Sequence, residues 1–330
     1  MFYSVIVPCY KSDKTIEEVV VLTSQEFEKM GIKEYEFVLV NDCSPDEGKT
    51  WNEIKRLTNE YPTVKGINFS KNFGQHSAIL AGLKYAEGNC FISMDDDLQT
   101  HPSQLSKLIE AFSEGYDVVY GYYPEKKHSL FRRLGTMFNN FSAEKLLNKP
   151  KDIHCTSFWI VRKYVRDYII SFDGPYPYLL GIILNATSNI KSVPVKHFER
   201  KYGQSGYTLK KLLGLWSNYI GFSILPLRLA AYTGYGISGL SIIAGIVVFI
   251  RKLMHPNMAA GWPSLMIVFL LSLGIELIFL GIVGEYIGRT YLKLNSEPQY
   301  VIKEQINHST REKGKVNEED IDIRSGECSD

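Results

Sequence analysis

Three acids directly follow a short apolar run in the stretch Cys90-Phe91-Ile92-Ser93-Met94-Asp95-Asp96-Asp97. The apolar part is typical of a buried strand. Leu98 and Gln99 come next, and then Pro102, a residue that can open a helix. A strand that ends in acids before a helix predicts carboxylates at the carboxyl edge of a sheet, where open α/β sheets bind ligands.

The spacing of Asp95 and Asp97, two residues apart, suits a divalent cation. Mg²⁺ typically takes one or two protein carboxylates and leaves its other positions to water and substrate phosphates. Taken alone, an acidic triplet is more typical of a solvated loop. The rest of the chain favours the metal site.

Length, charge and cysteine content exclude several classes of protein. The chain has 330 residues and a net charge of +1, so it has room for about two domains and shows no electrostatic sign of a nucleic-acid partner. Its five cysteines are scattered and form no C-x-x-C pair. This pattern indicates reduced thiols, rather than a disulfide framework or a zinc site.

Strand patterns alternate with helix patterns over the first 200 residues. The expected strands are 4–8, 36–40, 64–69, 90–94 and 117–120. The expected helices are 15–30, a segment around 51–57, 77–86 and 102–112. Apolar strands separated by helices predict an α/β domain with a mostly parallel, Rossmann-like sheet. The first loop lacks G-x-G-x-x-G, which counts against a dinucleotide fold.

Two long apolar stretches follow, and they predict a transmembrane hairpin. The expected spans are 229–251 and 263–285, the second interrupted by Glu276. Each is long enough to cross a hydrocarbon core of about 30 Å. A buried hairpin of a soluble domain is the alternative. Basic residues flank the pair on its outer sides, so the positive-inside rule places the large domain and both termini in the cytoplasm.

The remaining boundaries follow from these spans. Residues 1–205 form the expected catalytic domain, and 206–228 an amphipathic juxtamembrane segment, for which a plain core helix is an equal alternative. Residues 252–262 form the extracytoplasmic loop and 286–330 a cytoplasmic tail. The tail is expected to be disordered from about residue 303, because it is highly charged and poor in apolar residues.

Six segments together resemble membrane-anchored family 2 glycosyltransferases of the polyprenyl-phosphate type, which include dolichol-phosphate mannose synthases, bactoprenol glucosyl transferases and undecaprenyl-phosphate aminoarabinose-type transferases. The similarity runs from about residue 3 to 302. The segments are Val5-Ile6-Val7-Pro8-Cys9-Tyr10, Val40-Asn41-Asp42-Cys43-Ser44, Ser70-Lys71-Asn72-Phe73-Gly74-Gln75-His76, Asp95-Asp96-Asp97-Leu98-Gln99, Arg200-Lys201-Tyr202-Gly203-Gln204-Ser205-Gly206-Tyr207 and Gly284-Glu285-Tyr286-Ile287-Gly288-Arg289.

The resemblance implies a GT-A fold, a nucleotide-sugar donor and a Mg²⁺ or Mn²⁺ cofactor. The positions that match a nucleotide pocket are Pro8, Tyr10, Asp42 and Lys71. Asp95 and Asp97 match the metal ligands, and Asp96, which lies between them in the donor site, has an open role. Gln99 matches a residue near the sugar, and His76 is equally well explained as a structural polar residue.

The implied acceptor is a polyprenyl (undecaprenyl) phosphate, which is already anionic near neutral pH because its second pKa is about 6. Cations must therefore hold it. The candidates are Arg132, Arg133, Arg200 and Lys201, and Arg132 and Arg200 join Asp97 and Gln99 as expected catalytic residues. Lys126 and Lys127 are possible helpers, although a solvated basic face explains them better.

Two positions depart from the family pattern. Tyr123 stands where many relatives carry an arginine, and Thr156-Ser157-Phe158 stands where some carry an acid. We therefore name no general base. The resemblance further implies a multi-pass protein of the bacterial plasma membrane, a homo-oligomer with a tetramer as the expected form, and a product used in cell-envelope glycan modification.

Two other functions are compatible with parts of this pattern. A processive polysaccharide synthase would use the same fold, but it would normally show Q-x-x-R-W and more spans, and the sequence has neither. A non-catalytic membrane protein that binds nucleotide sugars would not need the Asp95/Asp97 pair.

Overall fold

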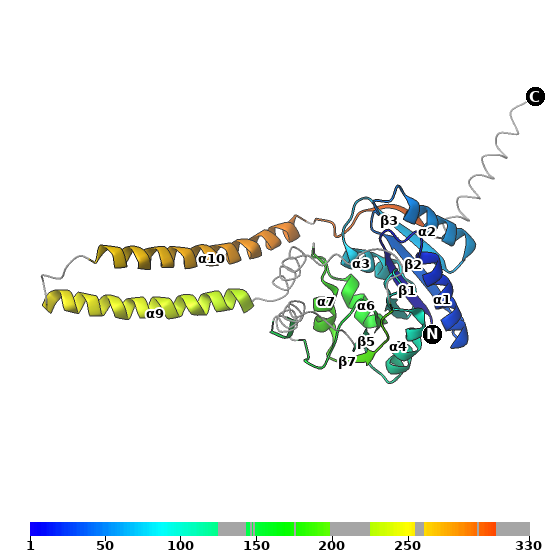
Figure 1. Cartoon of the computed structure of the whole chain (residues 1–330), viewed down its shortest axis with the longest axis horizontal. Coiled ribbons are helices and arrows are strands. Elements are labelled where there is room, and N and C mark those ends of the chain that lie inside the picture. The colour runs from blue at the N-terminus through cyan, green and yellow to red at the C-terminus, as the bar shows by residue number, and fades with distance from the viewer. Residues whose placement is uncertain are drawn as a thin grey trace, which may run out of the picture. The chain divides into compact units, whose positions relative to one another are not determined.

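The computed structural model describes residues 1–124, 143–145, 147, 149–174, 176–198, 225–254, 261–295 and 297–307 (Figure 1). The chain divides into two compact units, one within 1–138, 149–207 and 298–330, the other within 139–148 and 208–297. The strands are β1 Tyr3–Cys9, β2 Tyr35–Asn41, β3 Val64–Phe69, β4 Cys90–Ser93, β5 Val118–Tyr122, β6 Trp159–Arg162, β7 Ile190–Pro194 and β8 Ile302–Ile306. The helices are α1 Ile16–Lys29, α2 Lys49–Glu60, α3 Gln75–Tyr85, η1 Pro102–Gln104, α4 Leu105–Ser113, α6 Lys163–Ile170, α7 Leu179–Ala186, α9 Leu225–Met254 and α10 Trp262–Leu294.

The first unit is built on an eight-stranded sheet with the order β7-β5-β6-β4-β1-β2-β3-β8. β1 pairs in parallel with β2 and with β4, β2 pairs in parallel with β3, and β5 does so with β7. β6 is antiparallel to both of its neighbours, and β8 is antiparallel to β3. The sheet is therefore mixed but mostly parallel, as the alternating sequence pattern predicts.

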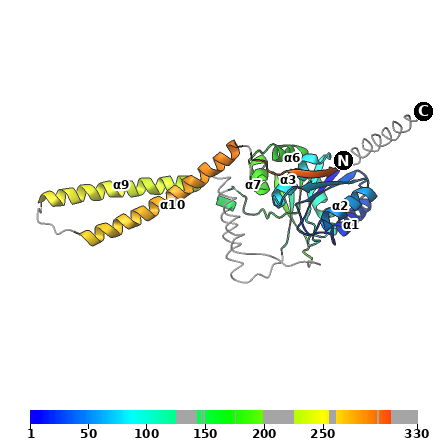
Figure 2. The ribbon, with the colours of Figure 1, turned by 90° about the horizontal axis from the view of Figure 1, so that it is seen from above.

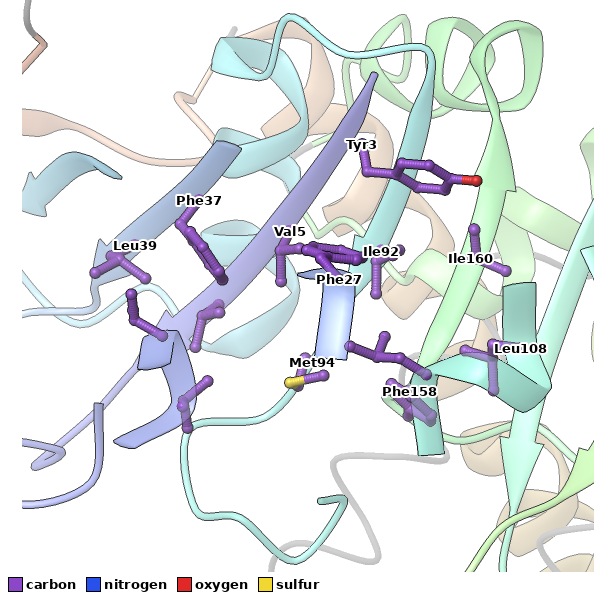
Figure 3. Packing of buried hydrophobic residues seen from close by; sticks show 14 of the residues in the cluster. Tyr3, Val5, Phe27, Phe37, Leu39, Ile92, Met94, Leu108, Phe158 and Ile160 are labelled. Carbon is purple, nitrogen blue, oxygen red and sulfur yellow. The ribbon is translucent and has the colours of Figure 1, made fainter. Parts of the chain in front are cut away.

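One face of the sheet is covered by α1, α2 and α4. Phe27 of α1 projects onto the strands beside Val5 and Ile92, in a cluster that also contains Phe37 and Leu108 (Figure 3). These side chains are 0% exposed. Alternate residues of each strand enter this cluster because successive side chains of a strand point to opposite faces.

The opposite face is covered by α3 and α6. α3 packs so closely on β1 that a Cβ added to Gly82 would lie 2.4 Å from the Cγ2 atom of Ile6. The guanidinium of Arg166, on α6, stacks over the ring of Phe91 at 4.5 Å. With helices on both faces, the sheet is doubly wound, and its ligand-binding edge is the one where β1, β2 and β4 end.

The last strand, β8, follows α10 in the sequence but belongs to the sheet of the first unit, where it pairs with β3. Ser70 N donates to Val301 O at 3.0 Å, and the ring of Tyr300 stacks on Phe69 at 5.3 Å. Glu304 accepts a hydrogen bond from Trp51 Nε1 at 2.8 Å and forms an ion pair with Lys55 at 2.9 Å. The disorder expected from about residue 303 therefore does not cover β8, because the edge of β3 supplies backbone partners for an otherwise polar segment.

The second unit contains the two long helices α9 and α10, which contact each other; they lie alongside each other in Figure 1 and cross at an angle when seen from above in Figure 2. In the described residues, the segment that is long and apolar enough to cross a membrane is Leu271–Leu294. α10 extends past the expected span end at 285, and α9 begins before the expected start at 229. The predicted pair of spans stays a prediction.

Candidate active site

The carboxyl ends of β1, β2 and β4 meet at one edge of the sheet. Asp42 N donates to Cys9 O at 3.1 Å, and Met94 N donates to Ile6 O at 3.1 Å, so strand pairing continues up to the loops. Tyr10 and Asp42 directly follow β1 and β2, and the triplet 95–97 follows β4 after one further residue, Met94. The structure thus brings together the predicted donor-pocket and metal residues that lie after these three strands.

Backbone strain is concentrated at this edge. Lys11, Cys43 and Leu98 have positive φ angles of 58°, 49° and 59°, and each lies in a loop that follows one of these strands. Left-handed backbone is uncommon outside glycine and persists only where the surrounding structure fixes it. Leu98 is 3% exposed, and its buried side chain holds the turn that separates Asp97 from Gln99.

Asp95 is held at both carboxylate oxygens. Oδ1 accepts a hydrogen bond from Gln75 Nε2 at 2.8 Å, and Oδ2 accepts one from the hydroxyl of Ser157. Burial raises the pKa of Asp95 to about 6, and the charges of Asp97 and Asp96 add to this effect. Three carboxylates in one partly buried loop therefore repel one another, which is the electrostatic setting that a cation relieves.

Asp96 ties two loops together. Its Oδ2 atom accepts a hydrogen bond from Tyr10 N at 2.9 Å. Burial raises the pKa of Asp96, and the Tyr10 bond partly opposes the shift. Asp96, whose role the sequence left open, therefore links the loop after β1 to the loop after β4.

Asp97 and Gln99 lie beside the segment that follows β7. Gln99 N donates to Asp97 Oδ1 at 3.0 Å, and Phe198 N donates to Gln99 O at 2.9 Å. The Nε2 atoms of Gln99 and His197 are 3.4 Å apart. This segment therefore reaches the acidic loop across about a hundred residues of sequence.

Asp42 is 5% exposed and organises the loop after β3. Its two carboxylate oxygens accept hydrogen bonds from Phe73 N at 2.7 Å and Gly74 N at 2.8 Å. Asn72 Nδ2 also donates to Asp42 O at 3.2 Å. Burial raises the pKa of Asp42, while the two N–H groups act in the opposite direction.

The other predicted pocket residues differ in exposure. Tyr10 is 47% exposed at the edge, whereas Pro8 is buried within β1. Lys71 is exposed, with its Nζ atom 5.0 Å from the centre of the Phe73 ring. Tyr10 and Lys71 are thus the pocket residues with accessible side chains.

Comparison with known proteins identifies the family. The family model described as "Glycosyl transferase family 2" matches residues 4–206. This chain belongs to glycosyl transferase family 2. The predicted family and enzyme class are thereby confirmed, and the mostly parallel, doubly wound sheet is a GT-A fold, as predicted.

Relatives of this family 2 glycosyltransferase match over nearly its whole length. The Bacillus subtilis (strain 168) protein "Uncharacterized glycosyltransferase YkcC" is 33% identical over 91% of this chain and 93% of that protein. "Undecaprenyl-phosphate 4-deoxy-4-formamido-L-arabinose transferase" of Edwardsiella ictaluri (strain 93-146) is 32% identical over 92% of this chain and 93% of that protein.

Among solved structures, M. tuberculosis glucosyl-3-phosphoglycerate synthase in complex with Mn²⁺ and UDP-glucose is 16% identical to this chain. The similarity covers 67% of this chain and 77% of that chain, with a TM-score of 0.48.

Several residues of this glycosyltransferase site were given no role from the sequence, although Gln75, Ser157 and Tyr123 lie in segments that were compared with the family. Gln75, Ser157 and His197 reach the acidic loop from α3, from the loop before β6 and from the segment after β7. The ring of Tyr123 packs on His197 at 4.3 Å, and its hydroxyl contacts Thr100. A tyrosine carries no positive charge, so Tyr123 does not replace the arginine of relatives as a cation; burial raises its pKa to about 12, which keeps the phenol neutral.

The predicted acceptor cations lie outside the described residues. They are Arg132, Arg133, Arg200 and Lys201, together with the possible helpers Lys126 and Lys127. Their roles stay predictions.

Proposed function

We propose that this enzyme transfers a sugar, with inversion, from a nucleotide-sugar donor, a UDP-sugar, to undecaprenyl phosphate. The product would be a lipid-linked sugar for modification of a cell-envelope glycan. The observation that carries the proposal is the meeting of the Asp95–Asp97 loop with Tyr10 and Asp42 at one sheet edge. The undecaprenyl-phosphate transferase that is 32% identical over 92% of the chain supports the choice of acceptor.

The residues at this edge fit a divalent cation. Asp95 and Asp97 are hard oxygen ligands, which suit Mg²⁺ or Mn²⁺. In the described ranges, no group of three or more His, Cys, Asp or Glu side chains forms a closed metal site. An open site of two carboxylates, completed by water and the donor diphosphate, agrees with both observations. When bound, the cation would neutralise the diphosphate leaving group.

The chain's own residues would supply alignment. Asp96 and Asp42 fix the loops that surround the donor, through Tyr10 N and through Phe73 N and Gly74 N. Positioning of two reactants can supply much of a rate enhancement. The acceptor phosphate is anionic near neutral pH, so the reaction needs little help from a base. In the segment Thr156-Ser157-Phe158, where some relatives carry an acid, the Ser157 hydroxyl donates to Asp95.

The acceptor phosphate would be held by Arg132, Arg133, Arg200 and Lys201. A guanidinium suits this task because it donates to phosphate in a fork. Arg200→Ala should then raise the acceptor concentration needed for half-maximal rate more than the donor concentration. A loss of donor affinity with unchanged acceptor dependence would contradict the assignment.

A lipid acceptor agrees with the apolar helices of the second unit. We infer that α9 and α10 cross the bacterial plasma membrane as a hairpin, with the catalytic unit and both termini on the cytoplasmic side. The membrane-length segment Leu271–Leu294 and the basic residues beside the predicted spans support this topology. Assembly of the chain into a homo-oligomer stays a prediction.

The test is an assay of the full-length protein in detergent with undecaprenyl phosphate and a panel of nucleotide sugars. We expect a lipid-linked monosaccharide from one donor, with Mg²⁺ or Mn²⁺, and loss of product in excess EDTA. Asp97→Asn should nearly abolish transfer, because loss of a metal ligand removes several kcal/mol of transition-state stabilisation. Asp152→Asn, at an exposed aspartate, is the matched control.

Three outcomes would contradict the proposal. Full activity of Asp97→Asn, or of the wild-type protein in EDTA, would exclude the metal role. A product that carries many sugars would indicate a processive synthase. Donor binding without transfer or hydrolysis under every condition would indicate a non-catalytic binding protein.

A further inference from the structure

Asp95 is fixed by two side chains that come from distant parts of the sequence. Gln75 Nε2 donates to Oδ1 at 2.8 Å, and the Ser157 hydroxyl donates to Oδ2. Gln75 is the first residue of α3, and Ser157 lies two residues before β6. A carboxylate that is held at both oxygens has lost its freedom to rotate.

The residues next to each of these donors make contacts of their own. Gly74, the residue before Gln75, has a φ of 88° and donates its N–H to Asp42. Next to Ser157, the hydroxyl of Thr156 donates to Gly121 O at 2.5 Å, and the side chain of Phe158 is 0% exposed. The backbone next to each donor is therefore anchored, to Asp42 beside Gln75 and to Gly121 of β5 beside Ser157.

We propose that Gln75 and Ser157 are positioning residues that aim the carboxylate of Asp95 at the divalent cation of the donor diphosphate. The inference rests on the proposed function. An ionised carboxylate has about four lone-pair sites on its two oxygens. One hydrogen bond at each oxygen therefore leaves further lone pairs for a cation, in an orientation that the two donors set.

The effect of removing such donors can be scaled. Side chains that orient a metal ligand typically contribute about 10- to 100-fold to metal affinity or activity. A purely structural role would act differently. In that case the two bonds would join α3 to the loop before β6, and their loss would lower the unfolding temperature without changing metal affinity.

The experiment measures Mn²⁺ binding rather than turnover. The full-length protein in detergent is titrated with Mn²⁺, with and without UDP, and free Mn²⁺ is read by electron paramagnetic resonance. Gln75→Met removes the amide donor and keeps the length of the side chain, and Ser157→Ala removes the hydroxyl. Ser157→Thr keeps the hydroxyl, and Gln25→Met, at an exposed position of α1, is the matched control.

We expect Gln75→Met and Ser157→Ala to raise the Kd for Mn²⁺ by about 10- to 100-fold, with UDP affinity in the absence of metal unchanged. Ser157→Thr and Gln25→Met should bind Mn²⁺ as the wild type does. Wild-type Mn²⁺ affinity in Gln75→Met and Ser157→Ala would overturn the inference while leaving the proposed function intact. A wild-type protein that binds no Mn²⁺ even with UDP would overturn the metal dependence of the proposed function, and this inference with it. If Ser157→Ala does not fold, Gln75→Met alone decides.

Discussion

Replacement of Asp42 by asparagine tests how the loop after β3, residues 70–74, is held in place. Both carboxylate oxygens of Asp42 accept backbone N–H groups, from Phe73 at 2.7 Å and from Gly74 at 2.8 Å. An asparagine has one acceptor oxygen and one NH₂ group. Whichever way its amide points, one of the two N–H groups loses its acceptor and faces another donor.

The size of the effect follows from these contacts. A hydrogen bond to a charged group contributes about 1.5–3 kcal/mol. Burial raises the pKa of Asp42 because removing the charged carboxylate from water costs free energy. Part of the hydrogen-bond energy offsets this cost. A neutral asparagine amide does not carry the same cost, so the net loss is smaller than the sum of two such bonds. We therefore expect Asp42→Asn to lower the free energy of unfolding by about 2 kcal/mol. For a unit of about 200 residues, this corresponds to a fall of about 4–8 °C in Tm.

The assay is thermal unfolding of the detergent-solubilised protein, together with UDP binding. UDP affinity should fall as well, because the loop that Asp42 holds also carries Lys71. Asp152→Asn serves as the control, since that aspartate is exposed. An Asp42→Asn protein with the wild-type Tm and the wild-type UDP affinity would refute the view that Asp42 clamps this loop.

Three further predictions concern other parts of the catalytic unit. Burial lowers the pKa of His76 to about 4, so stability should fall as pH drops from about 6.5 to 4, by at most about 3 kcal/mol; unfolding midpoints of His76→Asn should depend less on pH, and a parallel dependence would contradict this. Gly82→Ala should destabilise by about 1–3 kcal/mol in chemical unfolding, because its Cβ would lie 2.4 Å from Ile6, and a gain in stability would show that α3 shifts freely. Glu304→Ala removes the acceptor of Trp51 Nε1, so amide hydrogen exchange in β8 should accelerate, and unchanged exchange would mean that backbone pairing alone holds the strand.

The parallel part of the fold could be predicted from the sequence because its signals are local. The apolar runs at 4–8, 36–40 and 64–69 correspond to β1, β2 and β3, and the acids at 95–97 lie at the predicted sheet edge. Each of these strands carries its own apolar pattern and is followed by a helix with its own periodicity. Local pattern and tertiary structure agree there, so the prediction holds.

The antiparallel strands could not be predicted in the same way. β6 has only four residues. In β8, Ile302–Ile306, three polar residues separate the two isoleucines. Such short or polar segments become strands only when a neighbouring edge offers hydrogen-bond partners. No role in the site could be predicted for Gln75, Ser157 and His197 for a related reason. Their contacts with the acidic loop join distant segments, and the spacing of residues in the sequence does not indicate such contacts.

The position of β8 has a consequence for how the enzyme is made. β7 and β8 belong to the same sheet, yet α9 and α10 lie between them in the chain. The ribosome must therefore complete both apolar helices before the final strand can pair with β3. A protein cut after residue 205 would leave the edge of β3 uncovered, and uncovered edges promote aggregation. Completion of the catalytic sheet thus occurs only in chains whose apolar helices have already been synthesised.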